Sequence, residues 1–433
     1  MRKLIRTGMP VFAVMILLLG ILLAYLLLYN GPSSGSSSAQ PASSSPVTVT
    51  VWAQDSGDQR QASLSASIER FNRSQSAIHI VPYFYKEEQY KAKLKVAMVS
   101  GKMPDLFYYW FGRSFKYMVD SGRVADLTDR IDRHPDFRNR FYPDALQKAT
   151  YDNRIYGVPH STYHVIVWYN RRIFEENGLK PPATWEEMMG IVRKLNASGI
   201  TPIAVAGKER WPLLNWFAYL SNRIGGNEPF ERVLNGQGDF TDPSFVEAGM
   251  KLRELVDNNA FIPGFSGMNV SAVEEAFLAG KAAMYLQGDW SSDKLLRNEE
   301  IGYFRFPDLG GKGKTTNYYG GYGAGWAIAS NGHEDAAFQV LDFLLSPQEW
   351  AGFVAASGSP PTMRDLPIAE SGIRPAVLKY VQFIQSDPTG YFGYYDQELE
   401  PRRAQMLLDG VLKMAYAPRM SREEIIELLG RIR

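Results

Sequence analysis

Cysteine is the most informative absence in this chain of 433 residues, because it does not occur at all. Without thiols the chain can form no disulfide, no thiolate metal site and no cysteine nucleophile, and it offers no cysteine for an N-terminal lipid. A surplus of positive charge is also missing, since 47 Lys and Arg residues stand against 46 Asp and Glu residues. Neutralising a phosphate backbone needs such a surplus, so we expect no nucleic-acid partner.

Histidine is scarce as well, with five residues in the chain, of which only His160 and His164 lie close together. On an extended segment these two share a face, but no third ligand of the zinc type accompanies them, so we expect no metal site. The stretch from Asp308 to Thr315 nearly matches a phosphate-binding loop, but it has Asp308 where that motif needs glycine. We therefore expect no nucleotide and no other cofactor.

An uninterrupted apolar stretch, Val11 to Tyr29, follows the basic residues 1–10. As a helix it would span nearly the roughly 30 Å of a bilayer core, whereas the apolar part of a cleaved signal is usually about 7 to 15 residues long. The length predicts an uncleaved transmembrane anchor, with a cleaved signal sequence as the alternative. The basic residues would then stay in the cytoplasm, and the rest of the chain would lie outside the cell. Residues 30–46, rich in Ser, Gly and Pro, predict a flexible tether.

From Val47 onward, extended segments alternate with helical patterns. Val47 to Val51 has a period of two, Gln61 to Asn72 is helical, and Ile78 to Val81 is extended again. A helix through Tyr90 and another extended piece, Asp105 to Tyr108, follow. This β-α-β-α-β order predicts an α/β protein with a mainly parallel sheet flanked by helices, and ligand loops at the carboxyl ends of the strands.

Capping boxes predict helix starts further along the chain, because a Ser, Thr or Asn oxygen can accept from the first turn while a Glu three residues later reaches back. The predicted pairs are Thr184/Glu187, Ser271/Glu274, Asn331/Glu334, Ser346/Glu349 and Ser421/Glu424.

Aromatic residues make up 13% of the chain, and two of the nine tryptophans end glycine-containing segments. Trp290 ends the segment Gly280 to Trp290, and Trp326 ends the run Asn317 to Trp326. A pyranose has an apolar face of C–H groups and a rim of hydroxyls, so rigid aromatic rings with a few polar groups match it. Glycine lets the backbone come close to such a ligand. The pattern favours sugar binding, with burial of the rings in a core as the alternative.

Several short segments occur in an order and at intervals that are typical of one family. They are Gly101–Leu106, Tyr156–Pro159, Trp168–Asn170, Phe174–Leu179, Pro182–Glu187, Phe277–Met284, Gly288–Trp290 and Gly325–Ile328. Together they resemble the extracellular solute-binding protein family 1, the sugar-binding subunits of ABC importers, which includes maltose-binding protein. The resemblance covers the chain from about Val47 to its end.

The resemblance implies a two-lobed periplasmic-binding-protein-like fold of type II, each lobe a mainly parallel sheet flanked by helices, with hinge crossovers. One lobe would take residues 47–160 with 322–372, and the other 161–321 with 373–433. A sugar or oligosaccharide would be captured as the lobes close over it. The resemblance further implies a monomeric receptor without enzymatic activity, which delivers its ligand to ABC permease subunits in the membrane.

Ligand contacts are carried over only to positions that match the family pattern. They are Gln54, Asp55, Tyr109, Trp110, Arg113, Tyr163, Trp211, Asp289, Trp290, Tyr319, Tyr322 and Trp326. Trp290 is the strongest candidate for a ring that stacks on the sugar. Tyr163 stands where maltose-binding protein has a sugar-contacting acid, which argues against the same sugar.

Two other functions stay open at this point. A glycan-processing enzyme outside the cell would line its subsites with the same aromatic residues, and it would need two carboxyl groups about 5 to 10 Å apart. A sensor component would present the bound ligand to a membrane receptor instead of a permease.

Overall fold

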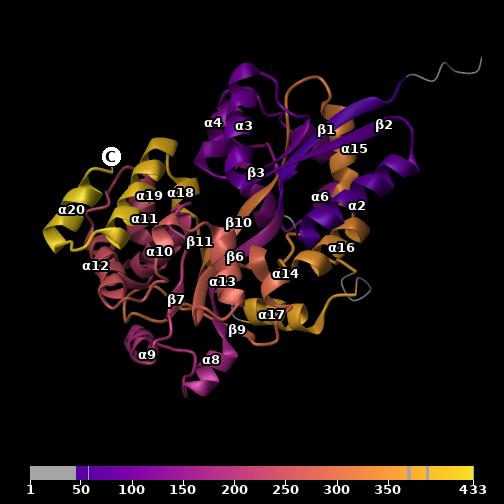
Figure 1. Cartoon of the computed structure of the whole chain (residues 1–433). Helices are drawn as coiled ribbons and strands as arrows, with labels where there is room; N and C mark the ends of the chain where they lie inside the picture. The colour runs from indigo at the N-terminus through magenta and orange to yellow at the C-terminus, as the bar shows by residue number, and fades with distance from the viewer. Residues whose placement is uncertain (1–44, 57, 368–371, 387–389, 433) are drawn as a thin grey trace, which may run out of the picture. The chain divides into compact units, whose positions relative to one another are not determined.

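The computed structural model describes residues 45–56, 58–367, 372–386 and 390–432, and Figure 1 shows their fold. Contacts within the chain separate residues 1–45 from a second unit, Pro46 to Arg433, to which every element described below belongs. The anchor expected at residues 11–29 lies outside the described residues, as does nearly all of the tether. Within the described ranges, no helix combines the length and the apolar character that a membrane crossing requires.

The first part of the sheet has the order that the sequence predicts. Its elements are β1 (Val47–Gln54), α2 (Gln59–Ser74), β2 (Ile78–Tyr85), α3 (Glu87–Ser100) and β3 (Leu106–Trp110). The strands lie in the order β2–β1–β3 and are parallel. Val49 and Val51 are buried while Thr50 is only half-buried, as a period of two requires. The β-α-β-α-β prediction is confirmed.

Two long strands connect this part of the sheet to the rest. These strands, β6 (Val158–Asn170) and β10 (Asn317–Ile328), pair antiparallel with each other, and β10 also pairs antiparallel with β3. On its other edge β6 runs antiparallel to β8 (Met284–Gly288). The strand β9 (Ile301–Phe304) pairs antiparallel with Val167 to Asn170 of β6, on the same edge as β10 but further along the strand. The full order is β2–β1–β3–β10–β6–β8–β7, where β7 is Ile203–Ala204. The crossovers are as expected, but the second part of the sheet is mixed rather than mainly parallel, because β6 opposes its neighbours.

The remaining elements are mostly helices, which pack against the sheet or against one another. The helices are α4 (Arg113–Asp120), α5 (Thr128–Arg133), α6 (Pro135–Asn139), α7 (Pro143–Gln147), α8 (Arg171–Glu176), α9 (Trp185–Ala197), α10 (Trp211–Gly225), α11 (Glu228–Leu234), α12 (Pro243–Asp257), α13 (Val270–Leu278), α14 (Ser292–Leu295), α15 (Glu334–Leu344), α16 (Pro347–Ser357), α17 (Pro375–Gln385), α18 (Tyr395–Glu398), α19 (Pro401–Tyr416) and α20 (Arg422–Gly430). Two 3-10 turns, η1 (Phe265–Gly267) and η2 (Asp289–Ser291), and the strands β4 (Thr150–Tyr151), β5 (Arg154–Ile155) and β11 (Gly390–Phe392) complete the set within the described ranges.

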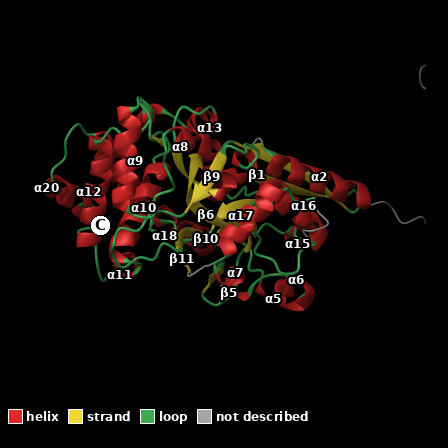
Figure 2. Ribbon diagram, turned by 90° about the horizontal axis from the view of Figure 1, so that it is seen from below, coloured by secondary structure: helices red, strands yellow, loops and turns green. Residues whose placement is uncertain are grey.

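Buried apolar residues gather in separate cores. Helices α15 and α16 pack against α2, and their apolar residues join those of β1 and β3 in one group. Helices α10, α12 and α19 pack on one another in a second group. Figures 1 and 2 show the two groups of helices on opposite sides of β6 and β10. Two cores joined by long strands are the arrangement that two lobes with crossovers need.

The close pairing of β6 and β10 depends on glycines. Gly320 has a φ of 149°, and a Cβ atom there would meet the carbonyl oxygen of Tyr163. A Cβ atom at Gly325 would meet backbone atoms of Val158 and Pro159. Backbone atoms cannot move aside as a flexible side chain can, so glycine is what allows the two strands to approach this closely.

The capping predictions are partly confirmed. Thr184 and Ser421 form complete capping boxes at the starts of α9 and α20. The other three are wrong as capping boxes. Asn269 caps α13 in place of Ser271, because the helix starts earlier. At α15, which begins at Glu334, the Glu334 carboxylate does accept from the backbone N–H of Asn331, but Asn331 Oδ1 accepts from His333 rather than from the first turn of the helix. Ser346 precedes α16, but its side chain makes no capping hydrogen bond.

Candidate functional site

The residues expected to contact a ligand differ in their exposure. The half-buried ones are Gln54, Asp55, Tyr109, Trp110, Trp211, Trp290 and Tyr322. Four are buried, because Tyr319 and Asp289 have no exposed surface, Trp326 is 3% exposed and Tyr163 is 6% exposed. Trp326 lies in the core around β1 and β3, which is the alternative that the sequence left open. Asp289, Tyr319 and Trp326 present almost no surface to a ligand, so they do not enter the site proposed below, whereas Tyr163 enters it because its ring packs against Trp290.

Three aromatic side chains from distant parts of the chain meet around Trp290. The centre of its ring lies 5.8 Å from that of Tyr163, 5.7 Å from that of Trp211 and 6.3 Å from that of Tyr394. Tyr163 and Trp211 meet it nearly edge-on, with interplanar angles of 73° and 71°. We call Tyr163, Trp211, Trp290 and Tyr394 the aromatic cluster. Tyr394, which follows β11, is the member that the sequence prediction missed.

Local sequence explains how Trp290 reaches this position. The strand β8 ends at Gly288, and η2 turns the chain so that the Trp290 ring folds back over that glycine. A Cβ atom at Gly288 would overlap the ring, so the glycine makes room for it. Trp290 is thereby fixed by its surroundings while part of its ring stays accessible.

Asp289 supports this turn from inside the protein. Its carboxylate accepts hydrogen bonds from the backbone N–H of His164 (3.1 Å), from Nδ1 of His164 (2.7 Å) and from the hydroxyl of Tyr380 (3.0 Å). The Nε2 atom of His164 is hydrogen-bonded to the hydroxyl of Tyr391 at 3.1 Å. Since Asp289 is wholly buried and both oxygens are occupied, its role in this structure is to hold η2 and Trp290 against β6.

The aromatic residues of β3 adjoin the aromatic cluster. Tyr108 is hydrogen-bonded through its side chain to Tyr163, which links β3 to the cluster. Its ring centre lies 5.4 Å from that of Trp110, and the ring centre of Tyr109 lies 5.9 Å from that of Trp110. Lys91 lies over the Trp110 ring at 5.2 Å. The half-buried rings of β3 therefore continue the aromatic surface toward α3.

Arg60 lies beside these aromatic residues, and the sequence prediction missed it. Asp58 caps α2 by accepting from the backbone N–H of Arg60, and its carboxylate also accepts from the Arg60 Nε at 2.9 Å. Burial acts to lower the pKa of Arg60, but the charge and hydrogen bonds of Asp58, with smaller effects from Tyr163, raise it on balance. The guanidinium, in a side chain that is 20% exposed, therefore remains charged next to Tyr163.

His160 lies behind the same surface. It is 3% exposed, and its Nε2 atom is hydrogen-bonded to the hydroxyl of Tyr163 at 3.3 Å. Burial, together with the positive charge of Arg60, lowers the pKa of His160 to about 3. The imidazole is therefore neutral at physiological pH. Among the described residues, no group of three or more His, Cys, Asp or Glu side chains is arranged to hold a metal ion.

Two carboxyl groups near the aromatic residues have raised pKa values. Burial raises the pKa of Glu209, which precedes α10, and the negative charges of Glu87 and Glu88 add to the effect. Burial also raises the pKa of Asp396 in α18, although Lys91 acts in the opposite direction. Glu209 accepts a hydrogen bond from the backbone N–H of Val270 at 3.2 Å.

Contacts join the parts of the chain that carry the two cores. Arg113, an exposed residue at the start of α4, donates from Nη2 to the carbonyl oxygen of Leu234 at 2.8 Å. Lys148 forms an ion pair with Glu398 of α18. Arg113 was expected to contact the ligand, and its guanidinium instead reaches the end of α11.

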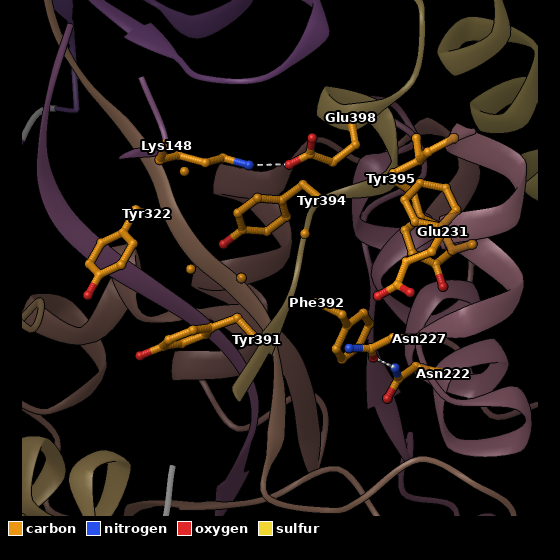
Figure 3. A pocket seen from close by; sticks show the side chains of 16 residues that line it. Lys148, Asn222, Asn227, Glu231, Tyr322, Tyr391, Phe392, Tyr394, Tyr395 and Glu398 are labelled. Atoms are coloured by element: carbon orange, nitrogen blue, oxygen red, sulfur yellow. Dashed lines mark hydrogen bonds and ion pairs between the residues drawn. The ribbon is translucent and has the colours of Figure 1, made fainter. Parts of the chain in front are cut away.

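A cavity of about 290 Å³ lies next to the crossover strand β10. Its lining includes Gly320 to Gly323 of β10, the segment Tyr391 to Tyr395, and residues of α11. Figure 3 shows the Lys148–Glu398 pair at one end and the Asn222–Asn227 pair at the other. Tyr322 lines this cavity, whereas Trp290 and Trp211 do not; Tyr394 belongs both to the lining and to the aromatic cluster. We call this space the hinge cavity.

Comparison with known proteins shows the family. The family described as bacterial extracellular solute-binding protein matches residues 55–349, more than half of the chain. An uncharacterized ABC transporter extracellular-binding protein of Pyrococcus horikoshii is 24% identical over 293 residues, which are 64% of this chain and 62% of the relative. The multiple sugar-binding protein of Streptococcus mutans is 24% identical over 354 residues, 78% of this chain and 79% of that protein. The match thus spans less than two thirds of the first relative.

Solved structures share the architecture over nearly the whole chain. A structure from work on xylan utilization by the thermophilic bacterium Caldanaerobius polysaccharolyticus has a TM-score of 0.84 at 25% identity, and the match covers 89% of this chain and 100% of that one. A chitin oligosaccharide binding protein has a TM-score of 0.82 at 23% identity, with 90% and 98% covered. These likenesses confirm the two-lobed α/β fold with its crossovers. The chain therefore belongs to the family of bacterial extracellular solute-binding proteins, as its sequence motifs predict.

Proposed function

We propose that the solute is a carbohydrate and that the aromatic cluster binds it. The observation that carries the proposal is the half-buried ring of Trp290, which Tyr163, Trp211 and Tyr394 hold in place. Such a fixed ring offers apolar area to the C–H face of a sugar at little entropic cost. Arg60 and the phenol groups of Tyr108 and Tyr163 supply the hydrogen-bonding groups that a ring of hydroxyls needs.

The lobes in this proposal take residues 47–160 with 322–372, and 161–321 with 373–433. The separate cores support this division, because the core around β1 and β3 also contains Trp326 to Met363, while the core around α10 also contains Phe392 to Ile432. The aromatic cluster draws Trp211 and Trp290 from the second lobe and adjoins Tyr108 and Arg60 of the first. A sugar that contacts both would favour closure of the lobes, since a ligand shifts the equilibrium toward the state that it binds better.

Delivery of the sugar to an ABC importer is part of the proposal. The receptor would act as a monomer and would present its closed form to permease subunits. The apolar segment 11–29 would anchor it in the membrane and hold the rest of the chain outside the cell. The name of the Pyrococcus relative, an ABC transporter extracellular-binding protein, supports this partnership, and the name of the Streptococcus relative supports a sugar as the solute. Loss of sugar uptake on deletion of the gene, restored by the full chain, would support transport. Unchanged uptake with loss of a sugar-induced response would favour the sensor instead.

Binding without chemical change is the remaining part of the proposal. An oligosaccharide incubated with the purified protein should be recovered intact, as chromatography would show. Release of shorter products would favour the glycan-processing enzyme. Glu209 and Asp396, whose carboxyl groups have raised pKa values, would then be the first residues to replace.

A panel of sugars tests the carbohydrate assignment. It includes xylo-oligosaccharides, chitin oligosaccharides, raffinose and the common monosaccharides, because similar structures come from work on xylan utilization, from a chitin oligosaccharide binding protein and from a protein in complex with raffinose. A bound sugar raises the melting temperature with the logarithm of its concentration relative to the Kd, since it binds the folded state alone. At least one sugar of the panel should raise it by several degrees. A panel without any effect would exclude carbohydrates as the solute.

A further inference from the structure

The hinge cavity contains polar groups that the protein itself leaves without partners. Tyr394 is only 7% exposed. Its hydroxyl is buried and has no hydrogen-bond partner among the described residues. Figure 3 shows this hydroxyl directed into the space that Tyr322 and Tyr391 border. A buried hydroxyl without a partner costs about 1–3 kcal/mol, so a group that fills the cavity and pairs with it would be favoured.

Two further groups of the lining are open to a ligand. The Oδ1 atom of Asn227 accepts from Asn222 (2.7 Å) and from Asn317 (2.9 Å), but within the described residues its own amide nitrogen has no such partner. Glu231 of α11 also lines the cavity, and its carboxylate forms no ion pair or hydrogen bond with a described residue. The cavity thus offers a donor at Asn227, an acceptor at Glu231 and a hydroxyl at Tyr394.

The size and charge of the cavity narrow the class of ligand. Its volume of about 290 Å³ lies at the lower end of the range of ligand pockets, which favours a molecule with a single ring. An anion is disfavoured, because the Glu231 carboxylate has no partner among the described residues and Lys148, the cation of the lining, is already paired with Glu398. A purely apolar molecule would leave the polar groups without partners. The rings of Tyr391 and Phe392 can cover an apolar face.

We propose that the hinge cavity is a second binding site, separate from the aromatic cluster, for an uncharged, polyhydroxylated molecule with one ring, such as a monosaccharide. The site goes beyond the receptor function, because it needs no contact with Trp290. Its lining joins Lys148 of the first lobe, the crossover strand β10 and Glu231 of the second lobe. An occupant therefore stabilises this arrangement of the lobes and couples to the solute that closes them.

Calorimetric titration of the full-length protein with D-glucose, D-xylose and myo-inositol tests the second site. Binding of at least one of these probes should persist within about twofold in W290A. The same binding should weaken about tenfold in E231Q and in Y394F, which each remove one hydrogen-bonding group and correspond to about 1.4 kcal/mol. The matched control is E228Q, which alters an exposed glutamate of the same helix that does not line the cavity.

Two results would overturn the second site. One is that none of the three probes binds W290A. The other is that a probe binds W290A but binds E231Q and Y394F as tightly as the unchanged protein, since the probe would then lie outside the hinge cavity. E231Q changes an exposed side chain without a partner, so its folding is not in question, and its melting temperature verifies this. Failure of this site leaves the receptor proposal intact, because the oligosaccharide panel measures that proposal separately.

Discussion

Replacement of Asp289 distinguishes a structural role from a ligand contact. Resemblance to the family predicts that Asp289 binds the solute, whereas the structure buries its carboxylate completely. The three groups that donate to it are the backbone N–H and Nδ1 of His164 and the hydroxyl of Tyr380. We expect D289A to destabilise the fold and to impair binding only as a consequence.

The magnitude follows from the groups that D289A leaves without a partner. Each buried donor without an acceptor costs about 1–3 kcal/mol, and three donors that share one site and relax together should cost about 3–5 kcal/mol in total. D289N keeps one oxygen acceptor, so its loss should be smaller, about 1–2 kcal/mol. The control D409A removes the exposed partner of Arg210 and should cost less than about 1 kcal/mol.

Urea denaturation, followed by tryptophan fluorescence, measures these free energies of unfolding. The three variants and the unchanged protein should show the same dependence on urea, so that the midpoints report stability alone. The reasoning would be refuted if D289A unfolded within about 0.5 kcal/mol of the unchanged protein while it lost sugar binding. Asp289 would then be a ligand contact that the described conformation conceals.

The other predictions concern pH and the crossover strands. The pKa of His160 is about 3 in the fold and about 6.5 without it, so its contribution to stability is complete above pH 6.5 and declines as the pH falls toward 3. The free energy of unfolding should therefore fall less between pH 7 and pH 5 in H160N than in the unchanged protein, and the two decreases should differ by about 1–2 kcal/mol. Equal decreases in the two proteins would contradict the burial of a neutral imidazole. G325A should destabilise the fold by about 2 kcal/mol or more, because the added methyl group would collide with the backbone of Val158. G352A lies in an exposed and open part of α16 and should stabilise the fold by about 0.5–1 kcal/mol. Thermal unfolding of the two variants measures both effects.

Local patterns predicted the parts of the fold that depend on neighbouring residues. The period of two at Val47 to Val51 and the capping boxes at Thr184 and Ser421 need contacts within a few residues only, and all are confirmed. The start of α2 was set two residues late, because Asp58 rather than a later residue caps it. That small shift concealed Arg60, which lies in the first turn beside Tyr163.

Contacts between distant residues could not be predicted from local patterns. Asp289 and His164 are separated by 125 residues, and their hydrogen bond exists only because β8 pairs with β6. Trp290 and Tyr394 meet because β11 pairs with β10, which no motif in the sequence indicates. The sequence motif therefore selected Trp290, whose contact with a ligand stays a prediction, while the burial of Asp289 and the position of Tyr394 beside Trp290 required the structure.

The most direct test of the receptor account is the affinity of W290A for the sugar that the panel identifies. Loss of a fixed, half-buried ring from the centre of a binding surface should cost about 2 kcal/mol or more, which is a loss of about 30-fold in Kd by calorimetric titration. The matched control, Y416A, removes an aromatic side chain that is 58% exposed at the end of α19 and should leave the Kd unchanged. A W290A protein that melts like the unchanged protein and binds the sugar with the same Kd would contradict the account.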